Sequence, residues 1–167
     1  MQIFLTIVGG AATFVLGQII LRIVVEPVHS MKSVVAEISH KLMLHAKIYA
    51  NPKPTGDESY DEVMDEFREI SSKLLSAMYL VPRYELTALI FGLPSKENVI
   101  DASKNLIGLS NGHDHLLENQ GFLNRYYSQH IRDSLGLYMR PEERLNPDLE
   151  EKLIDRKSTR LNSSHDQ

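Results

Sequence analysis

Residues 1–21 read MQIFLTIVGGAATFVLGQIIL, and this stretch decides how the rest of the chain is organised. It contains no charged side chain, and Arg22 follows it directly. Because a helix rises about 1.5 Å per residue, the stretch spans roughly 31 Å, close to the ~30 Å hydrocarbon core of a bilayer. Its strongly apolar side chains favour insertion by roughly 3 to 7 kcal/mol, of which Gly, Thr and Gln return a part. The sequence therefore predicts a transmembrane anchor over residues 1–25.

A cleavable signal peptide and a soluble core helix are the two alternatives to an anchor. A signal peptide has a positively charged segment before its apolar run and small residues at the cleavage site, but here the basic residue, Arg22, follows the run. A core helix of a soluble protein rarely contains eighteen or more consecutive uncharged, mostly apolar residues. A spanning helix therefore accounts for the stretch better than either alternative.

The basic residues beside the anchor predict its orientation. Arg22, Lys32, Lys41 and Lys47 all follow the span, and no Lys or Arg precedes it. By the positive-inside rule, the N-terminus lies outside and the soluble domain is cytoplasmic, which makes the chain a single-pass protein of the cell inner membrane. Arg22 is expected at the membrane interface, where its guanidinium reaches the lipid headgroups.

Small residues recur along one face of the anchor, at Thr6, Gly10, Thr13 and Gly17. Spacings of four, three and four place them on one side of a helix, where they allow another helix to approach closely. This face predicts helix packing in the membrane and a homo-oligomer. The alternative is that Gly and Thr are simply frequent in spanning helices.

The composition limits what else the chain contains. Its 167 residues suffice for an anchor and one domain, and with no cysteine it has neither disulfides nor thiolate chemistry. A net charge of −4 without a basic face argues against nucleic acid as a partner. With no tryptophan and no strand-like alternation, we expect an all-α fold: one N-terminal transmembrane helix followed by a small four- to five-helix bundle.

Residues 26–50 predict a juxtamembrane helix that packs inside the bundle. Pro27 removes one backbone donor and is expected to kink or break it just beyond the membrane. Residues 51–58 read as a linker because NPKPTGD at 51–57 combines two prolines with a glycine. The expected apolar stripe has spacings of four and three: Val24, Val28, Met31, Val35, Ile38, Leu42, His45 and Tyr49.

Residues 59–136 predict the helical bundle. Its first helix is expected to open with a capping box from Ser59 to Glu62, and Ser95 is expected to cap the helix over 96–110. The segment LIFGLP, residues 89–94, either touches a membrane or partner or packs against neighbouring helices. In the last helix, 118–135, we expect Phe122, Leu123, Tyr126, Tyr127, Ile131 and Leu135 inside, and Arg125, Gln129, Arg132 and Asp133 outside.

Several polar groups have the side chains that divalent metals prefer. The triplet His113-Asp114-His115, with His130 and Asp133 as more distant ligands, resembles the HD pairs of metal phosphohydrolases and is the main candidate for a metal site. The alternative is a polar interhelical loop. Asp61, Glu62 and Asp65 form a weaker candidate and are expected to be a solvated helix face. His29, His40 and His45 are too unevenly spaced for a metal site, and His45 is expected to be a partly buried packing residue.

The C-terminal part falls into two segments. Residues 137–154 are interrupted by prolines and charged, which predicts a loosely attached and truncated extension. Residues 155–165, DRKSTRLNSSH, resemble a translated sequencing-library adapter, since one reading frame of the common adapter gives these residues in order. Residues 155–167 are therefore expected to be an adapter artefact that contributes nothing to the fold.

The segment GQIILRIVVEPV, residues 17–28, resembles short uncharacterised bacterial or phage membrane proteins with a single N-terminal span. The resemblance covers about the first fifty residues and transfers no functional residue. With no catalytic or cofactor motif, the chain is expected to be a membrane-anchored interaction, scaffold or regulatory module that needs no cofactor. Expected partners are the lipid bilayer, a second copy and a further protein. The alternatives are a metal-dependent enzyme at His113, His115 and His130, or a phage spanin-like envelope protein.

Overall fold

A computed structural model of the chain describes residues 1–113 and 119–146, and within these ranges every regular element is a helix. The elements are α1 (Gln2–Ile20), η1 (Leu21–Val25), α2 (Glu26–Leu44), α3 (Ala46–Tyr49), α4 (Glu58–Leu80), α5 (Tyr84–Phe91), α6 (Lys96–Ser110), α7 (Gln120–Leu135) and η2 (Pro141–Glu143). The all-α class is thus confirmed for the described ranges. The adapter-like residues 155–167 lie outside them.

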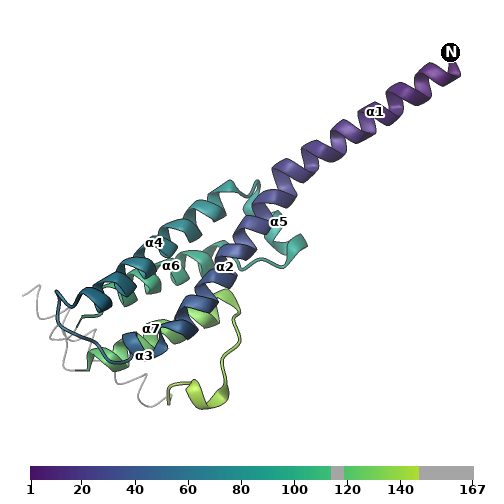
Figure 1. Cartoon of the computed structure of the whole chain (residues 1–167). Coiled ribbons are helices and arrows are strands. Elements are labelled where there is room, and N and C mark those ends of the chain that lie inside the picture. Colours follow the sequence, from purple (N-terminus) through teal and green to yellow (C-terminus); the bar gives the residue numbers. More distant parts are fainter. Residues whose placement is uncertain (114–118, 147–167) are drawn as a thin grey trace, which may run out of the picture.

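The N-terminal elements form one long rod. Figure 1 shows α1 and α2 as one continuous helix, of which α2 lies in the bundle and α1 projects away from it. The two join through η1, a single π-helical turn. In this turn the Glu26 N–H donates to the Leu21 carbonyl, five residues back. The wider turn immediately precedes Pro27, whose ring would otherwise collide with the carbonyl four residues earlier. Of the predicted kink or break at Pro27, the break is wrong: the helix continues past the proline, and the distortion is confined to the π-helical turn before it.

In the described part of the chain, α2, α4, α6 and α7 make an antiparallel bundle in chain order. α4 packs between α2 and α6, and α6 packs between α4 and α7 (Figure 1). We call the end from which α1 leaves the proximal end; it holds the start of α2, the end of α4, α5 and the start of α6. The opposite, distal end holds α3, the start of α4, the end of α6 and the start of α7.

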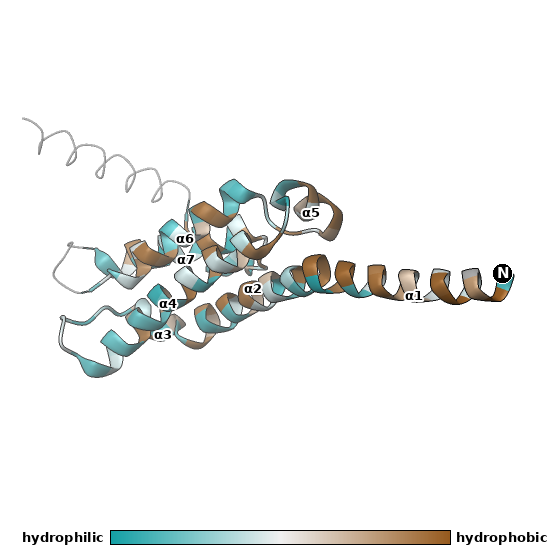
Figure 2. Ribbon diagram, turned by 90° about the horizontal axis from the view of Figure 1, so that it is seen from above, coloured by the Kyte–Doolittle hydropathy of each residue, from teal (hydrophilic) through white to brown (hydrophobic). Residues whose placement is uncertain are grey.

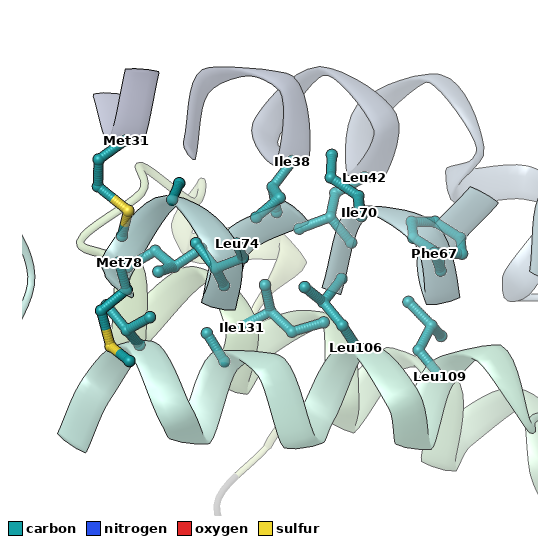
Figure 3. Packing of buried hydrophobic residues seen from close by; sticks show 14 of the residues in the cluster. Met31, Ile38, Leu42, Phe67, Ile70, Leu74, Met78, Leu106, Leu109 and Ile131 are labelled. Carbon is teal, nitrogen blue, oxygen red and sulfur yellow. The ribbon is translucent and has the colours of Figure 1, made fainter. Parts of the chain in front are cut away.

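The bundle core contains the apolar stripe expected on α2. Met31, Ile38 and Leu42 of that stripe are fully buried. They meet fully buried side chains from the other helices, and Figure 3 shows the cluster in detail. Each buried Leu, Ile or Phe contributes about 1.5 to 3 kcal/mol relative to exposure. The other large members include Tyr60, Met64, Phe67, Ile70 and Leu74 of α4, Leu106 and Leu109 of α6, and Ile131 of α7.

The helix caps agree with the sequence at one site and differ at another. Ser95 caps α6 as predicted, with its Oγ accepting from the Asn98 N–H. α4, however, is capped by Asp57, whose Oδ1 accepts from the Tyr60 N–H at 3.1 Å. The Ser59 hydroxyl donates to the same carboxylate, so Ser59 supports the cap instead of being it. Hydrogen bonds from Lys53, and then Ser59, lower the pKa of Asp57 to about 2.

Candidate functional site

α1 is the most apolar element of the described chain, and it carries the four small residues singled out in the sequence. Around Gly10 and Gly17 the structure leaves open space, so nothing in the described part of the chain covers that face. The hydroxyls of Thr6 and Thr13 donate to the carbonyls of Gln2 and Gly9, one turn back in the same helix. This satisfies both hydroxyls without water, as the interior of a bilayer requires.

Arg22 lies in η1, at the point where the uncharged helix ends, and its side chain is exposed. It is the first charged residue of the chain after the α-amino group. Figure 2 shows the change in hydropathy along the rod: the residues of α1 are mostly hydrophobic, and those of α2 are mixed. Arg22 lies at the transition between these two parts of the rod.

The histidines of the metal alternative lie in different surroundings. His113 Nε2 is 2.9 Å from Asp61 Oδ1, and its ring meets Tyr60 edge-on, 5.3 Å between centroids. His130 instead stacks on Tyr126 within α7, with the ring centroids 4.2 Å apart. Asp114 and His115 lie outside the described residues. Among the residues that are described, no three His, Asp or Glu side chains gather around one point.

The weaker metal candidates are also separated. Asp61 is held by His113 and by the Gly56 N–H, at 2.9 Å each. Asp65 lies 3.8 Å from Arg68, while Glu62 is exposed. His29 and His40 are exposed, and His45 packs edge-on against Phe67, with its Nε2 3.1 Å from Glu66 Oε2. Together they form a solvated face and a packing contact.

Lys41 and His45 both bind Glu66, which joins α2 to α4. The Lys41 Nζ donates to Glu66 Oε2 at 2.6 Å, on the same oxygen that His45 approaches. The hydrogen bond from Lys41 is the main reason why the pKa of Glu66 lies below its usual value, and the charge of Lys41 adds to it. This contact fixes the register between the rod and the bundle near the distal end.

A buried polar cluster at the distal end was not foreseen from the sequence. We call it the distal network, and its central residue is Asn124 of α7, which is fully buried. The Asn124 Nδ2 donates to the carbonyls of Tyr49 and Gly112, at 2.9 and 3.0 Å. Its Oδ1 accepts from the Gln120 amide at 2.9 Å. One side chain thus joins the end of α3, the end of α6 and the start of α7.

Two tyrosine hydroxyls complete the distal network. The Tyr60 hydroxyl donates to the Gly112 carbonyl, and the Tyr49 hydroxyl lies 2.9 Å from Ser128 Oγ. Gly112 is needed here because a Cβ at that position would lie 2.0 Å from Asn124 Oδ1. The signal available in the sequence was the four-residue spacing of Gln120, Asn124 and Ser128, which places three polar side chains on one face of α7.

α7 also corrects two predicted orientations. Gln129 and Arg132 were expected outside, but both are buried. The reason is that residues 137–146 fold back over α7: Gln129 Oε1 accepts from the Leu145 N–H at 2.8 Å, and the Arg132 guanidinium lies 3.6 Å from Glu143. This part of the predicted loose extension is therefore attached to the bundle, whereas residues 147–154 lie outside the described chain.

The proximal end carries an apolar surface, for which the sequence left two alternatives. In the segment 89–94, Leu93 is buried and Phe91 packs against the core, as the packing alternative expects. Leu89 and Ile90 are 82% and 67% exposed, so packing against neighbouring helices does not account for these two. Tyr79 and Leu80, at the end of α4, are exposed as well. Beside them is an open hollow of about 410 Å³, lined among others by Arg83, Lys96 and Glu85.

Comparison of the chain with protein-family models, curated proteins and solved structures gives no significant match. Function is accordingly inferred from the geometry of the chain itself.

Proposed function

We propose that this chain is a single-pass membrane protein whose helical bundle acts as an interaction or scaffold module beside the bilayer. The observation that carries the proposal is the environment of α1. Its most apolar eighteen-residue window has a mean hydropathy of 2.1, and none of that window is buried in the protein. An uncharged helix that the bundle leaves wholly exposed needs another apolar environment, and its length matches that of a bilayer.

The surroundings of α1 favour an anchor over a core helix and over a signal sequence. A core helix of a soluble protein would be mostly buried, whereas α1 projects away from the bundle (Figure 1). A signal sequence is separated from the mature protein by an extended cleavage segment, whereas here α1 continues through η1 into α2 without a break. A continuous helix from the membrane into a packed core supports a permanent attachment.

The charges along the rod and bundle support a cytoplasmic position for the bundle. The exposed acidic residues at the start of α4, Glu58, Glu62 and Asp65, lie at the distal end, as far from α1 as the bundle allows. Anionic lipid repels such a cluster, so this end points away from the bilayer. Together with the basic residues after the span, this gives an outside N-terminus. The acidic distal surface is then available to a protein partner.

The anchor is tested in cells by alkaline carbonate extraction of membranes that contain the full chain. We expect the wild type to remain in the membrane pellet and Val8→Arg/Val15→Arg to be released, because each Arg costs about 2.5 to 3.5 kcal/mol near the bilayer centre. Both valines are exposed, so the bundle stays folded. Met43→Arg, at an exposed apolar position of α2, is the matched control and stays in the pellet. A soluble wild type would contradict the proposal.

The orientation is tested with single cysteines, since the chain has none of its own. In intact cells, a membrane-impermeant maleimide is expected to label Gln2→Cys but not Thr55→Cys in the exposed linker. The reverse pattern would favour the spanin-like envelope protein.

The same preparations, labelled with a donor and an acceptor dye, show by energy transfer whether copies associate through the Gly10 and Gly17 face. A stoichiometric metal in the purified protein would favour the enzyme alternative.

A further inference from the structure

α5 is apolar on two opposite faces, although the bundle covers only one. Its inner face packs on the bundle through Tyr84, Thr87, Ala88 and Phe91, at spacings of three, one and three. Burial of the Tyr84 ring raises the pKa of its hydroxyl to about 12. The outer face consists of Leu86, Leu89 and Ile90, which are 53%, 82% and 67% exposed. A second, exposed apolar face of this kind normally marks a surface that something outside the chain covers.

The direction of α5 matches the surface of a membrane crossed by α1. α5 is turned by 98° from α4. α4 runs antiparallel to α2, and α2 continues the line of α1 through η1 (Figure 1). A helix perpendicular to the bundle at its proximal end therefore lies parallel to the plane of a bilayer that α1 crosses. Figure 2 shows this apolar helix at the end of the bundle from which the apolar α1 extends.

Two exposed cations beside α5, Arg83 and Lys96, fit anionic lipid headgroups, and the exposed Glu85 and Glu97 are close to them in sequence. Arg83 and Lys96 line the hollow of about 410 Å³ next to the exposed end of α4, and Glu85 is the one acidic residue among its lining. Within the described ranges, neither cation forms an ion pair. Tyr79, 77% exposed, lies beside them and is a side-chain type enriched at the membrane interface.

We propose that α5 is a second membrane contact, lying in the interface of the bilayer that α1 spans. In this arrangement Leu86, Leu89 and Ile90 enter the boundary between headgroups and acyl chains, and Arg83 and Lys96 bind lipid phosphates. The inference rests on the proposed anchor, which brings α5 to the membrane surface without any cost of association. The bundle then stands upright on the bilayer, with its acidic distal end outward.

The proposal is tested by electron paramagnetic resonance on the full chain in vesicles of phosphatidylcholine and phosphatidylglycerol. A nitroxide is attached to Leu89→Cys and, in a second protein, to Leu44→Cys. Both positions are exposed leucines, but Leu44 lies at the distal end of α2, about 33 Å along the helix from Arg22. We expect collisions with a water-soluble nickel complex to be several-fold fewer at position 89 than at 44, and collisions with oxygen to be more frequent.

Equal nickel accessibility at the two positions would overturn the proposal. Spin–spin broadening at position 89 that disappears on dilution with unlabelled protein would also overturn it, because a second copy would then cover α5. In vesicles of phosphatidylcholine alone, and in Lys96→Glu, we expect nickel accessibility at 89 to rise; an unchanged value would refute the role of the cations. Washing the vesicles with alkaline carbonate separates this inference from the proposed anchor. If the chain stays in the vesicles but position 89 is exposed to water, only the membrane contact of α5 is refuted. If carbonate releases the chain, the anchor is refuted as well.

Discussion

The distal and proximal ends of the bundle differ in whether their side chains find partners within the described chain. At the distal end, Asn124, Tyr49 and Tyr60 connect the ends of three helices by buried hydrogen bonds, and Phe67 is fully buried beneath them. At the proximal end, Leu89 and Ile90 face outward from α5, and a charged hollow lies beside it. The charges differ too: exposed carboxylates gather at the start of α4, whereas around α5 the exposed cations Arg83 and Lys96 lie among the exposed carboxylates Glu85 and Glu97.

This difference shows which end is complete within one chain. Among the described residues no buried side-chain polar atom lacks a partner, and at the distal end these partners join different helices. The proximal end has apolar side chains that no part of the described chain covers. A bundle closed at one end and open at the other, with an exposed apolar helix leaving the open end, is organised around an external surface at that end.

The largest expected difference in unfolding free energy is between removing a buried ring at the distal end and removing an exposed side chain at the proximal end. Phe67→Ala should lower the free energy of unfolding by about 3 to 5 kcal/mol, because it removes a fully buried ring that contacts Tyr49 and His45. Leu89→Ala should change it by less than about 0.5 kcal/mol. Urea unfolding in detergent micelles, followed by circular dichroism, measures both. Similar losses would mean that α5 is part of the core.

A smaller effect is expected from the distal network. Asn124→Leu keeps the volume but leaves the Tyr49 carbonyl and the Gln120 amide without their partners, which should cost about 2 to 3 kcal/mol of unfolding free energy. The matched control is Asn105→Leu in α6. Within residues 1–113 and 119–146, the Asn105 amide bonds only the Asp101 carbonyl of its own helix, so a change within about 0.5 kcal/mol is expected. If the two variants behave alike in urea, the network does not close the distal end.

The smallest effect is a pH dependence from the contact between α2 and α4. Because the pKa of Glu66 is lowered in the folded protein, chiefly by the hydrogen bond from Lys41, its contribution to stability is present above the unfolded value of 4.5. It is lost as the pH falls below that value and through the lowered pKa. Since the carboxylate is partly solvated, the loss between about pH 7 and pH 3 should be only about 0.5 kcal/mol.

The measurement for Glu66 is the unfolding free energy of the wild type and of Glu66→Gln across this pH range. The variant should be less stable near neutral pH and should depend less steeply on pH. Asp57 and Glu143, whose pKa values are also lowered, remain in both proteins and provide the common background. Parallel curves for the two proteins would show that Glu66 does not join α2 to α4 energetically.

The fold follows from apolar spacing to a large extent, and the departures have physical causes. The stripe of α2 was predictable because Met31, Ile38 and Leu42 repeat at helical spacing, and burial of apolar side chains dominates bundle formation. The burial of Asn124 was not, since its partners are carbonyls far away in the sequence. Arg132 was assigned to the surface because an isolated cation is rarely buried, and only the return of residues 137–146 provides Glu143 beside it.

The local rules failed where two of them competed. Asp57 and Ser59 are both good N-caps, and the helix begins two residues earlier than the capping box suggests, with Asp57 as the cap and Lys53 bound to its carboxylate. The exposure of α5 depends on the sharp turn after α4, where Arg83 adopts a positive φ of 45°. No periodicity in residues 84–91 reveals this turn, since both faces of the helix are apolar.

The π-helical turn η1 has a mechanical consequence. Because η1 joins α1 to α2 without interrupting the helix, the two helices cannot rotate independently about the helix axis. The face containing Gly10 and Gly17 therefore has a fixed angular position relative to the acidic start of α4. Two copies that met through that face would hold their bundles at one defined mutual angle, whereas a flexible tether would leave the angle free.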